Sequence, residues 1–269
     1  MNFISREKIR SLCNIILDKN DFLENGRILT YDNLNENFNN PKIIFCFSED
    51  LLLLKNKLHL FNNPFILISN NDDTNIYDNE DFNYIANHPI IFKWYAQNLL
   101  LNHSKVKLLP IGLADAKWEH GNQSLLLQTF QNLNNINKIN NIYFYCHIYS
   151  NFEKRNECYM KLKDYIPFTP RIDVGDYFNY LATFKFAICP EGNGIDTHRL
   201  WECFYLKVIP IVLDNDFIKL VKKKYNLHMI ILQDWNDIKN IDLNYIDFDN
   251  SILDFNNIKK EILDDLKEI

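Results

Sequence analysis

The sequence predicts an α/β protein made of two halves, each built around a parallel sheet. The first observation is that short apolar runs alternate with helical segments of about ten residues, which is typical of strand–helix–strand crossover units. The second is that polar, turn-forming residues follow these runs: Ser48–Asp50 follows Lys42–Phe47 (KIIFCF), and Asn70–Asp73 follows Pro64–Ser69 (PFILIS). The third is the length, because 269 residues are enough for two small domains with separate cores.

The remaining elements of the first half follow from spacing and composition. Asp50–Phe61 has helical spacing, Ile90–Leu101 fits either a strand or a helix, and Lys105–Gly112 (KVKLLPIG) predicts a strand that runs into a turn. The stretch Gly121–Asn140 is polar and rich in Asn and Gln, so it is interpreted as a linker region with a short helix at Ser124–Leu133.

The second half alternates more regularly. Strands are expected at Asn141–His147, Phe168–Ile172, Phe186–Cys189, Val208–Leu213 and His228–Leu232. Helices are expected at Glu153–Tyr165, Asp176–Phe184, Thr197–Leu206, Asp216–Tyr225 and Ser251–Ile269. The predicted domains are residues 1–135, residues 136–245, and a C-terminal helix in 246–269 that packs back on the first domain.

Composition excludes several function classes. The net charge of -6 argues against a nucleic-acid partner, which usually requires a basic face. No stretch approaches the roughly 18–20 apolar residues that span a bilayer, and the N-terminus lacks an apolar signal-peptide core. The six cysteines are scattered without a C-x-x-C pair, which predicts neither a zinc site nor a redox motif. We therefore expect a reducing, cytoplasmic location, which is the host cytoplasm if the chain is viral.

The segment Glu191–Glu202 (EGNGIDTHRLWE) carries the densest functional pattern. A strand ends, a loop with two of the six glycines follows, and a helix begins near Thr197, with Asp196 or Thr197 as its N-cap. Helix N-termini offer unpaired N–H groups and a positive dipole end, which suit a phosphate. The side chains and backbone expected to bind are Glu191, Asn193, Gly194, His198, Arg199 and Glu202. The competing interpretation is a capped helix with an exposed Arg–Glu pair.

Arg155 lies at another predicted helix start, just after the strand that ends at His147. It is the candidate for a second cation on a diphosphate. Taken alone, an arginine in a first helical turn is more often a solvated surface residue.

Three stretches resemble the exostosin-like glycosyltransferases, in the form found in small enzymes of large DNA viruses and microbes. The most specific is Phe184–Val212 (FKFAICPEGNGIDTHRLWECFYLKVIPIV), which resembles the donor-binding signature of that family. The others are Asn87–Asn122 (NHPIIFKWYAQN…KVKLLPIGLADAKWEHGN) and His228–Trp235 (HMIILQDW). Together they cover roughly half of the chain.

The resemblance implies a GT-B type fold, in which two Rossmann-like domains face a central cleft. It implies an inverting transfer without an obligatory metal or other cofactor, from a UDP-sugar such as UDP-xylose to a hydroxyl of a glycan or glycoprotein. Fucosyltransferases share a looser version of the motif, so a GDP-fucose donor is the nearest alternative, although His198 stands where they have an acidic residue. A non-catalytic sugar-nucleotide or glycan-binding protein with the same fold is the alternative from another class. Many members carry a membrane anchor, and none is expected here.

An inverting transfer needs a base that deprotonates the acceptor hydroxyl. Asp73 and Asp72 follow a predicted strand end, and adjacent carboxylates raise one another's pKa. Asp73 is preferred. A solvated Asn/Asp turn is the plain alternative, and an adjacent pair lacks the alternating spacing of a metal-binding Asp-x-Asp motif. The competing bases are Asp115, Glu119 and His120.

Aromatic and amide side chains supply the candidates for acceptor binding. Trp94, Trp118 and His120 are assigned to the acceptor, with the two tryptophans stacking on a sugar ring, although such residues often belong to a core. A looser set of ring-stacking or hydroxyl-binding candidates comprises Tyr95, Gln97, Asn98 and Asn122.

Overall fold

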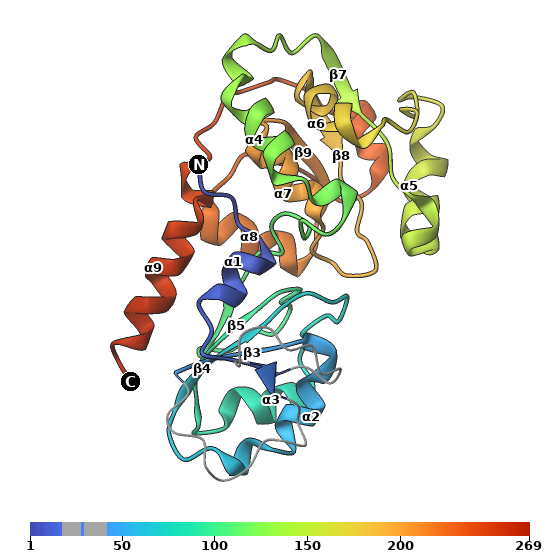
Figure 1. Ribbon diagram of the computed structural model, residues 1–269. Coiled ribbons are helices and arrows are strands. Elements are labelled where there is room, and N and C mark those ends of the chain that lie inside the picture. Colours follow the sequence, from blue (N-terminus) through green and yellow to red (C-terminus); the bar gives the residue numbers. More distant parts are fainter. Residues whose placement is uncertain (18–27, 30–41) are drawn as a thin grey trace. The chain divides into compact units, whose positions relative to one another are not determined.

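The computed structural model describes residues 1–17, 28–29 and 42–269, and these divide into two compact units. Asn2–Ile111 and Asp254–Ile269 form the first unit, and Gly112–Leu253 forms the second unit. The division after Ile111 lies upstream of the boundary expected after residue 135. Each unit contains one sheet in which every strand pair is parallel (Figure 1).

The first unit is Rossmann-like. Its described strands are β1 (Ile15–Leu17), β2 (Ile28–Leu29), β3 (Ile43–Cys46), β4 (Phe65–Ser69), β5 (Ile91–Ala96) and β6 (Val106–Leu108). They are arranged in the order β2-β1-β3-β4-β5-β6, so the direction of winding reverses between β1 and β3. This is the topology of a doubly wound sheet, in which ligands bind beyond the carboxyl ends of the strands. Strands β3 and β4 are completely buried, as expected for central strands of a parallel sheet.

The helices of the first unit are short apart from two. They are α1 (Arg6–Ser11), η2 (Ser48–Asp50), α2 (Leu51–Lys55), η3 (Leu58–Leu60), α3 (Glu80–Asn87) and α9 (Phe255–Leu266). The single helix expected at Asp50–Phe61 is therefore three short pieces, and Ile90–Leu101 is resolved as a strand. Helix α9 is fastened through Asp265, whose Oδ2 accepts hydrogen bonds from the Tyr95 hydroxyl at 2.5 Å and from Lys107 Nζ at 2.6 Å.

The second unit has four described strands in the order β10-β9-β8-β7. They are β7 (Asn140–Tyr143), β8 (Phe184–Ile188), β9 (Ile209–Leu213) and β10 (Ile230–Leu232). One buried cluster joins Phe186, Ile188, Ile209 and Ile211 of the central strands with Cys158 and Leu162, Trp235 and other residues that pack against them. Because the strand order follows the sequence, each crossover steps to the next position in the sheet.

Seven helical elements of the second unit bear on the site. They are η4 (Glu119–Gly121), α4 (Gln123–Gln131), η6 (Ile148–Asn151), α5 (Phe152–Leu162), α6 (Val174–Ala182), α7 (His198–Tyr205) and α8 (Asp216–Tyr225). Beyond them lie η5 (Leu133–Asn135), η7 (Trp235–Asn240) and η8 (Ser251–Leu253). Helix α4 packs against α6, where Thr129 Oγ1 donates to Asn179 Oδ1 at 2.8 Å, so residues 123–131 belong to the unit and are not a linker.

The strand expected at Phe168–Ile172 is wrong. These residues form no strand, although Thr169 bonds to Phe144 through its backbone N–H at 2.6 Å and through its hydroxyl oxygen, which accepts the Phe144 N–H at 3.1 Å. Thr169 alone supplies both contacts, so this apolar run does not form the repeated backbone hydrogen bonds of a strand pair.

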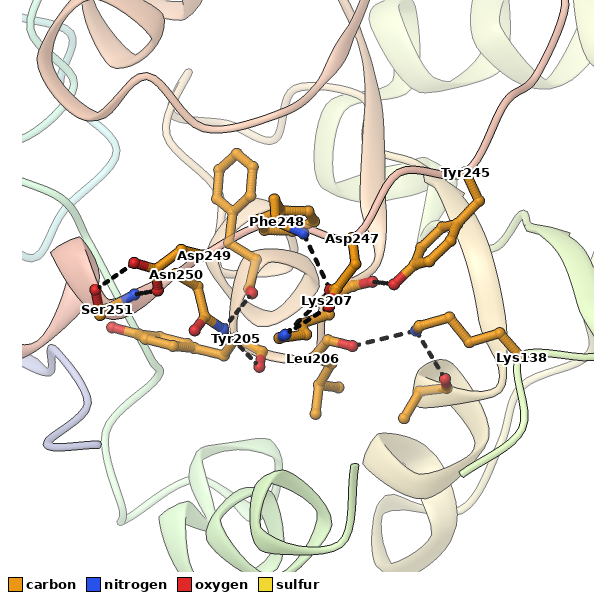
Figure 2. A network of polar contacts seen from close by, with 12 residues as sticks. Lys138, Tyr205, Leu206, Lys207, Tyr245, Asp247, Phe248, Asp249, Asn250 and Ser251 are labelled. Atoms are coloured by element: carbon orange, nitrogen blue, oxygen red, sulfur yellow. Dashed lines mark hydrogen bonds and ion pairs between the residues drawn. The ribbon is translucent and has the colours of Figure 1, made fainter. Parts of the chain in front are cut away.

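Side chains from distant segments cap the carboxyl end of α7 (Figure 2). Asn250 Nδ2 donates to the carbonyls of Phe204 at 2.9 Å and Tyr205 at 3.2 Å, and the Tyr245 hydroxyl donates to the Lys207 carbonyl at 3.1 Å. The last carbonyls of a helix have no partner inside it. Residues 245–250 therefore supply hydrogen-bond donors to carbonyls at the end of α7 and just beyond it.

Lys138 completes this end of the unit. Its ammonium donates to three carbonyls, those of Ala182 at 3.0 Å, Phe184 at 2.9 Å and Leu206 at 3.2 Å, and burial lowers its pKa to about 8. One cation thus joins the end of α6, the start of β8 and the end of α7.

Replacing Lys138 with methionine is expected to lower the free energy of unfolding by about 2 kcal/mol at pH 7, because three carbonyls lose their donor. The native pKa lies below the ordinary value of 10.5, so folding becomes more favourable as pH rises through the interval between about 8 and 10.5. Over that interval the stability difference between the wild type and Lys138→Met should grow by at most about 3.5 kcal/mol, at about 1.4 kcal/mol per pKa unit. Urea unfolding at several pH values measures both effects.

The exposed Lys223 of α8 provides the control for this substitution. Lys223→Met should leave the free energy of unfolding within about 0.5 kcal/mol of the wild type. A gap between wild type and Lys138→Met that narrows with rising pH would contradict the assigned shift.

Two further findings concern the sequence predictions. No helix among the described residues is long and apolar enough to cross a membrane. All six cysteines are buried free thiols, and Cys189 Sγ lies 3.7 Å from Cys203 Sγ.

Candidate functional site

A pocket opens at the carboxyl ends of β8 and β9, the two central strands of the second unit. It encloses about 480 Å³, part of it open to solvent. Its walls are apolar, and its polar lining comes from Lys154, Glu157, Glu191, Thr197 and Asn215. The apolar lining comprises Cys189, Pro190, Ile195, Leu200, Val212, Leu213, Ile218 and Trp235. A concave apolar pocket with a few convergent polar groups is the usual form of a small-molecule site.

The loop that follows β8 forms one wall of this pocket and is held from α5. Arg155 Nε donates to the Glu191 carbonyl at 2.8 Å, and Asn151 Nδ2 donates to the Gly192 carbonyl at 2.6 Å. Arg155 also donates to the His147 carbonyl at 3.0 Å, and burial lowers the pKa of its guanidinium. The candidate second cation is therefore engaged in positioning the loop.

Glu191 reaches the opposite wall. Its Oε1 accepts a hydrogen bond from Asn215 Nδ2 at 3.1 Å, while Asn215 Oδ1 caps α8 by accepting the Ile218 N–H at 2.8 Å. Farther along the loop, Gly192 N–H donates to the Gly194 carbonyl at 3.1 Å, which folds the loop tightly and leaves Asn193 exposed. Glu191 and the loop that follows it, both within the predicted donor segment, therefore lie together at this site.

The Arg199 side chain is surrounded by the rings of Tyr143 and Tyr177 and by the carboxylate of Glu202, and these three groups are called the box. Its guanidinium carbon is 4.9 Å from the ring centroid of Tyr143 and 5.1 Å from that of Tyr177, and its Nε is 3.4 Å from Glu202 Oε2. Burial alone would lower its pKa, but Tyr177, Tyr143 and Glu202 hold the pKa of Arg199 well above its ordinary value. The expected exposed Arg–Glu pair is thus mostly buried, with Arg199 at 22% and Glu202 at 6% side-chain exposure.

The same box fixes Glu202. Its Oε2 accepts the Tyr177 hydroxyl at 2.6 Å, and burial raises the pKa of that tyrosine. The Arg199 guanidinium also donates to the Tyr145 carbonyl at 3.1 Å. Glu202 therefore orients Arg199, and its carboxylate is not placed in the pocket described above.

Thr197, one of the two predicted N-cap residues of α7, does occupy the N-cap position. Its side chain makes no capping hydrogen bond there, and Asp196 Oδ1 accepts the Trp201 indole N–H at 2.6 Å. This contact satisfies the indole N–H of a fully buried tryptophan one turn into the helix.

The loop Gly112–Gly121 belongs to the same unit as the donor segment. Gly112, with φ of 65°, presents its carbonyl to His198 Nδ1 at 2.8 Å, so that nitrogen carries the proton. Gly121 lies so close to the backbone that an added Cβ would stand 1.9 Å from the Asp115 carbonyl oxygen. These two glycines fix the loop at both ends.

This loop presents the predicted acceptor residues Trp118 and His120. Their rings are stacked with centroids 6.3 Å apart and planes 16° apart, and the His120 ring is 6.5 Å from that of His198. Trp118 is 54% exposed, and the Lys117 ammonium lies 5.3 Å from its ring centroid. A row of three rings therefore runs from the donor segment to an exposed tryptophan.

The predicted catalytic pair lies in the first unit, after β4. Asp72 Oδ2 accepts the Glu49 N–H at 2.8 Å and Oδ1 accepts the Thr74 N–H at 2.7 Å. Burial raises the pKa of Asp72, while the two N–H groups lower it in part. Both oxygens are thus engaged in shaping the turn, whereas Asp73 is exposed.

Two candidate amides support this turn. Gln97 Oε1 accepts the Asn71 N–H at 2.6 Å, and Asn98 Nδ2 donates to the Asp72 carbonyl at 2.9 Å. Both residues are buried, which assigns them to the turn and away from a ligand. Asn122 likewise caps α4 by accepting the N–H groups of Ser124 and Leu125.

The assignment of Trp94 to the acceptor needs correction. Its side chain is 0% exposed in β5, and its indole N–H donates to Ser69 Oγ at 2.8 Å. Tyr95 is equally buried and bonds to Asp265. Neither ring has a face available for stacking on a sugar.

Three pocket residues, Lys154, Asn215 and Trp235, were not among the individually predicted site residues. They lie in the segments that follow β7, β9 and β10, and the expected topology does indicate these segments, because a parallel sheet places its ligands beyond the carboxyl ends of its strands. Within the described residues, no group of three or more His, Cys, Asp or Glu side chains is arranged to hold a metal ion.

No family model matches the chain, and no curated protein matches it. The pattern of residues and the geometry of the two units therefore provide the grounds for assigning a function.

Proposed function

We propose that the protein is an inverting, metal-independent glycosyltransferase that moves a sugar from a nucleoside-diphosphate donor, most simply a UDP-sugar, to a hydroxyl of a glycan. The observation that carries this proposal is the pocket at the ends of β8 and β9, walled by the segment that resembles a donor-binding signature. Under this proposal the two compact units are the two Rossmann-like domains of a GT-B fold.

The donor is assigned to the pocket by its chemistry. The apolar walls suit a nucleobase and ribose, while the carboxylate of Glu191, held by Asn215, suits hydroxyl donors such as those of ribose. Lys154 on the rim supplies a positive charge for the diphosphate. Arg199 contributes through its partly exposed guanidinium, and the loop held by Arg155 supplies backbone N–H groups.

The acceptor is assigned to the face that Trp118 presents. An exposed indole offers an apolar surface to the C–H groups of a sugar ring, and the adjacent imidazole of His120 offers polar contacts. The acceptor and donor residues named here all belong to the second unit.

One observation favours a non-catalytic sugar-nucleotide-binding protein as the second candidate. Both carboxylate oxygens of Asp72 accept backbone hydrogen bonds, so this member of the predicted acidic pair is engaged in the turn and is not prepared as a base. Such a protein would bind the donor and leave it intact.

The test is calorimetric titration with UDP, GDP and their common sugar conjugates, with and without EDTA. Binding that survives EDTA supports the proposal and selects the base, and release of UDP or GDP from a bound donor separates the enzyme from the binding protein. Absence of binding by every nucleotide would exclude both candidates.

Lys154→Glu is expected to weaken binding of UDP by about tenfold or more, because a cation at the pocket rim becomes an anion facing a diphosphate. The loss should shrink as ionic strength rises, since the Lys154 side chain is exposed. Titration calorimetry at two salt concentrations measures both effects.

Lys163→Glu makes the same charge change at the other end of α5, outside the pocket lining. Its affinity for UDP should remain within about twofold of the wild type, because screening weakens exposed charges beyond the Debye length. Equal losses in the two variants would place the diphosphate elsewhere.

A further inference from the structure

In the second unit, the neighbouring rings of Trp118, His120 and His198 place the His120 imidazole beside the donor segment. His120 stacks on Trp118 at 16° between planes, and its ring centroid is 6.5 Å from that of His198, the first residue of α7. His198 is itself fixed by the Gly112 carbonyl at 2.8 Å. The His120 ring thus lies between the exposed ring of Trp118 and the ring of His198, which the Gly112 carbonyl anchors.

The imidazole of His120 is also available for proton transfer. In the part of the chain that the structure describes, its side chain takes part in ring contacts and in no hydrogen bond or ion pair. The competing carboxylates differ: Asp72 accepts two backbone N–H groups, and Asp115 is 5% exposed. Glu119 is exposed, and no contact described above orients its side chain.

We propose that His120 is the general base that deprotonates the acceptor hydroxyl. This inference rests on the proposed function and replaces the acidic pair as its catalytic group. An exposed imidazole beside an indole that receives a sugar ring is within reach of that sugar's hydroxyl.

In the transfer, the acceptor O–H gives its proton to a ring nitrogen of His120. The acceptor oxygen forms a bond to the anomeric carbon, and the bond from that carbon to the diphosphate oxygen breaks. The electron pair leaves with the nucleoside diphosphate, whose charge the Arg199 and Lys154 cations offset. Water takes the place of the acceptor in slow donor hydrolysis and gives its proton to the same nitrogen.

The test measures UDP or GDP release from UDP-glucose, UDP-xylose, UDP-N-acetylglucosamine and GDP-fucose, with water as the acceptor. His120→Ala should release nucleotide about 100-fold more slowly than the wild type, the order expected for a lost general base. Its affinity for UDP should stay within about twofold, because His120 is outside the pocket lining. Added imidazole should restore at least part of the rate.

Two variants make the result specific. His59→Ala, a change at an exposed histidine of the first unit, should neither lose rate nor respond to imidazole. Asp73→Asn, a change at the exposed member of the acidic pair, should keep most of the rate, whereas the rate would be lost if that carboxylate were the base. Thermal unfolding checks that each variant is folded.

Equal rates for His120→Ala and the wild type would overturn the inference, as would a rate lost in Asp73→Asn and kept in His120→Ala. A loss that imidazole does not restore, accompanied by weakened UDP binding, would make His120 a positioning residue and also overturn it. A wild type that binds neither UDP nor GDP would instead remove the proposed function.

Discussion

Arg199→Met is expected to lower the free energy of unfolding by about 3–5 kcal/mol, the range found when one partner of a buried ion pair is removed. The substitution leaves the Glu202 carboxylate, 6% exposed, without its cation, and removes the group that stacks on Tyr143 and Tyr177. Cation–π contacts of this kind add to the loss. Urea unfolding at pH 7 measures the change.

The matched control is Lys219→Met on α8. Lys219 also pairs with an acidic side chain, Asp216, at 3.1 Å, but the two are 59% and 76% exposed. Such a pair contributes about 0–1 kcal/mol. The contrast between the two variants therefore tests burial and not the mere presence of an ion pair.

The double variant Arg199→Met with Glu202→Gln separates two contributions to the loss of stability. One is the lost attraction between the two side chains, and the other is the cost of a buried Glu202 carboxylate without a cation. Most of the predicted cost comes from leaving Glu202 ionised and unpaired, so neutralising it should recover about 1–3 kcal/mol. If the double variant is as unstable as the sum of the single ones, the box does not act as a coupled unit. UDP titration of the folded double variant then shows how much Arg199 contributes to donor binding.

Gly121→Ala is expected to reduce nucleotide release from a bound donor by about 100-fold while leaving UDP affinity nearly unchanged. The added Cβ would stand 1.9 Å from the Asp115 carbonyl oxygen and 2.8 Å from that of Ala114, so the loop must move. That movement displaces Trp118 and His120, which the loop presents, whereas the pocket is lined by other segments.

Gly175→Ala is the control for a glycine substitution in the same unit. Its Cβ would meet only the Asp173 carboxylate, at 3.3 Å, and a side chain can shift where a backbone carbonyl cannot. It should keep both UDP binding and nucleotide release. Normal release by Gly121→Ala would show that the loop is not needed for transfer.

Much of the fold could be predicted from the sequence because parallel sheets leave a strong local pattern. Apolar runs such as PFILIS and VIPIVL correspond to β4 and β9 within one residue at each end, and the expected helix Asp216–Tyr225 matches α8. Burial on both faces produces continuous apolar runs, so these strands need no long-range information. The strand predicted at Phe168–Ile172 is absent because a single residue, Thr169, makes the backbone contacts with Phe144 that strand pairing would have made.

The candidate site was less predictable, because its partners come from distant segments. The sequence indicated that Glu191 and Arg199 lie near each other, but not that Tyr143 and Tyr177 enclose the guanidinium. Nor does spacing reveal that Trp94 is buried while Trp118 is exposed, since both follow from packing. The turn at Asp72 shows the same limit, because its hydrogen-bond partner Glu49 lies in a separate segment, η2.

Helix α7 is held by hydrogen bonds at both ends. These bonds constrain the number of its residues as well as their identity. Its first residue bonds to the Gly112 carbonyl, and its last carbonyls bond to Asn250 and Lys138. An α-helix turns about 100° per residue. Inserting or deleting one residue between the two ends would therefore either rotate Arg199 away from Tyr143 and Tyr177 or separate the last carbonyls from their hydrogen-bond donors. Neither end can absorb that rotation without losing buried hydrogen bonds. We therefore expect that the number of residues in α7, which is eight, cannot change without loss of these contacts.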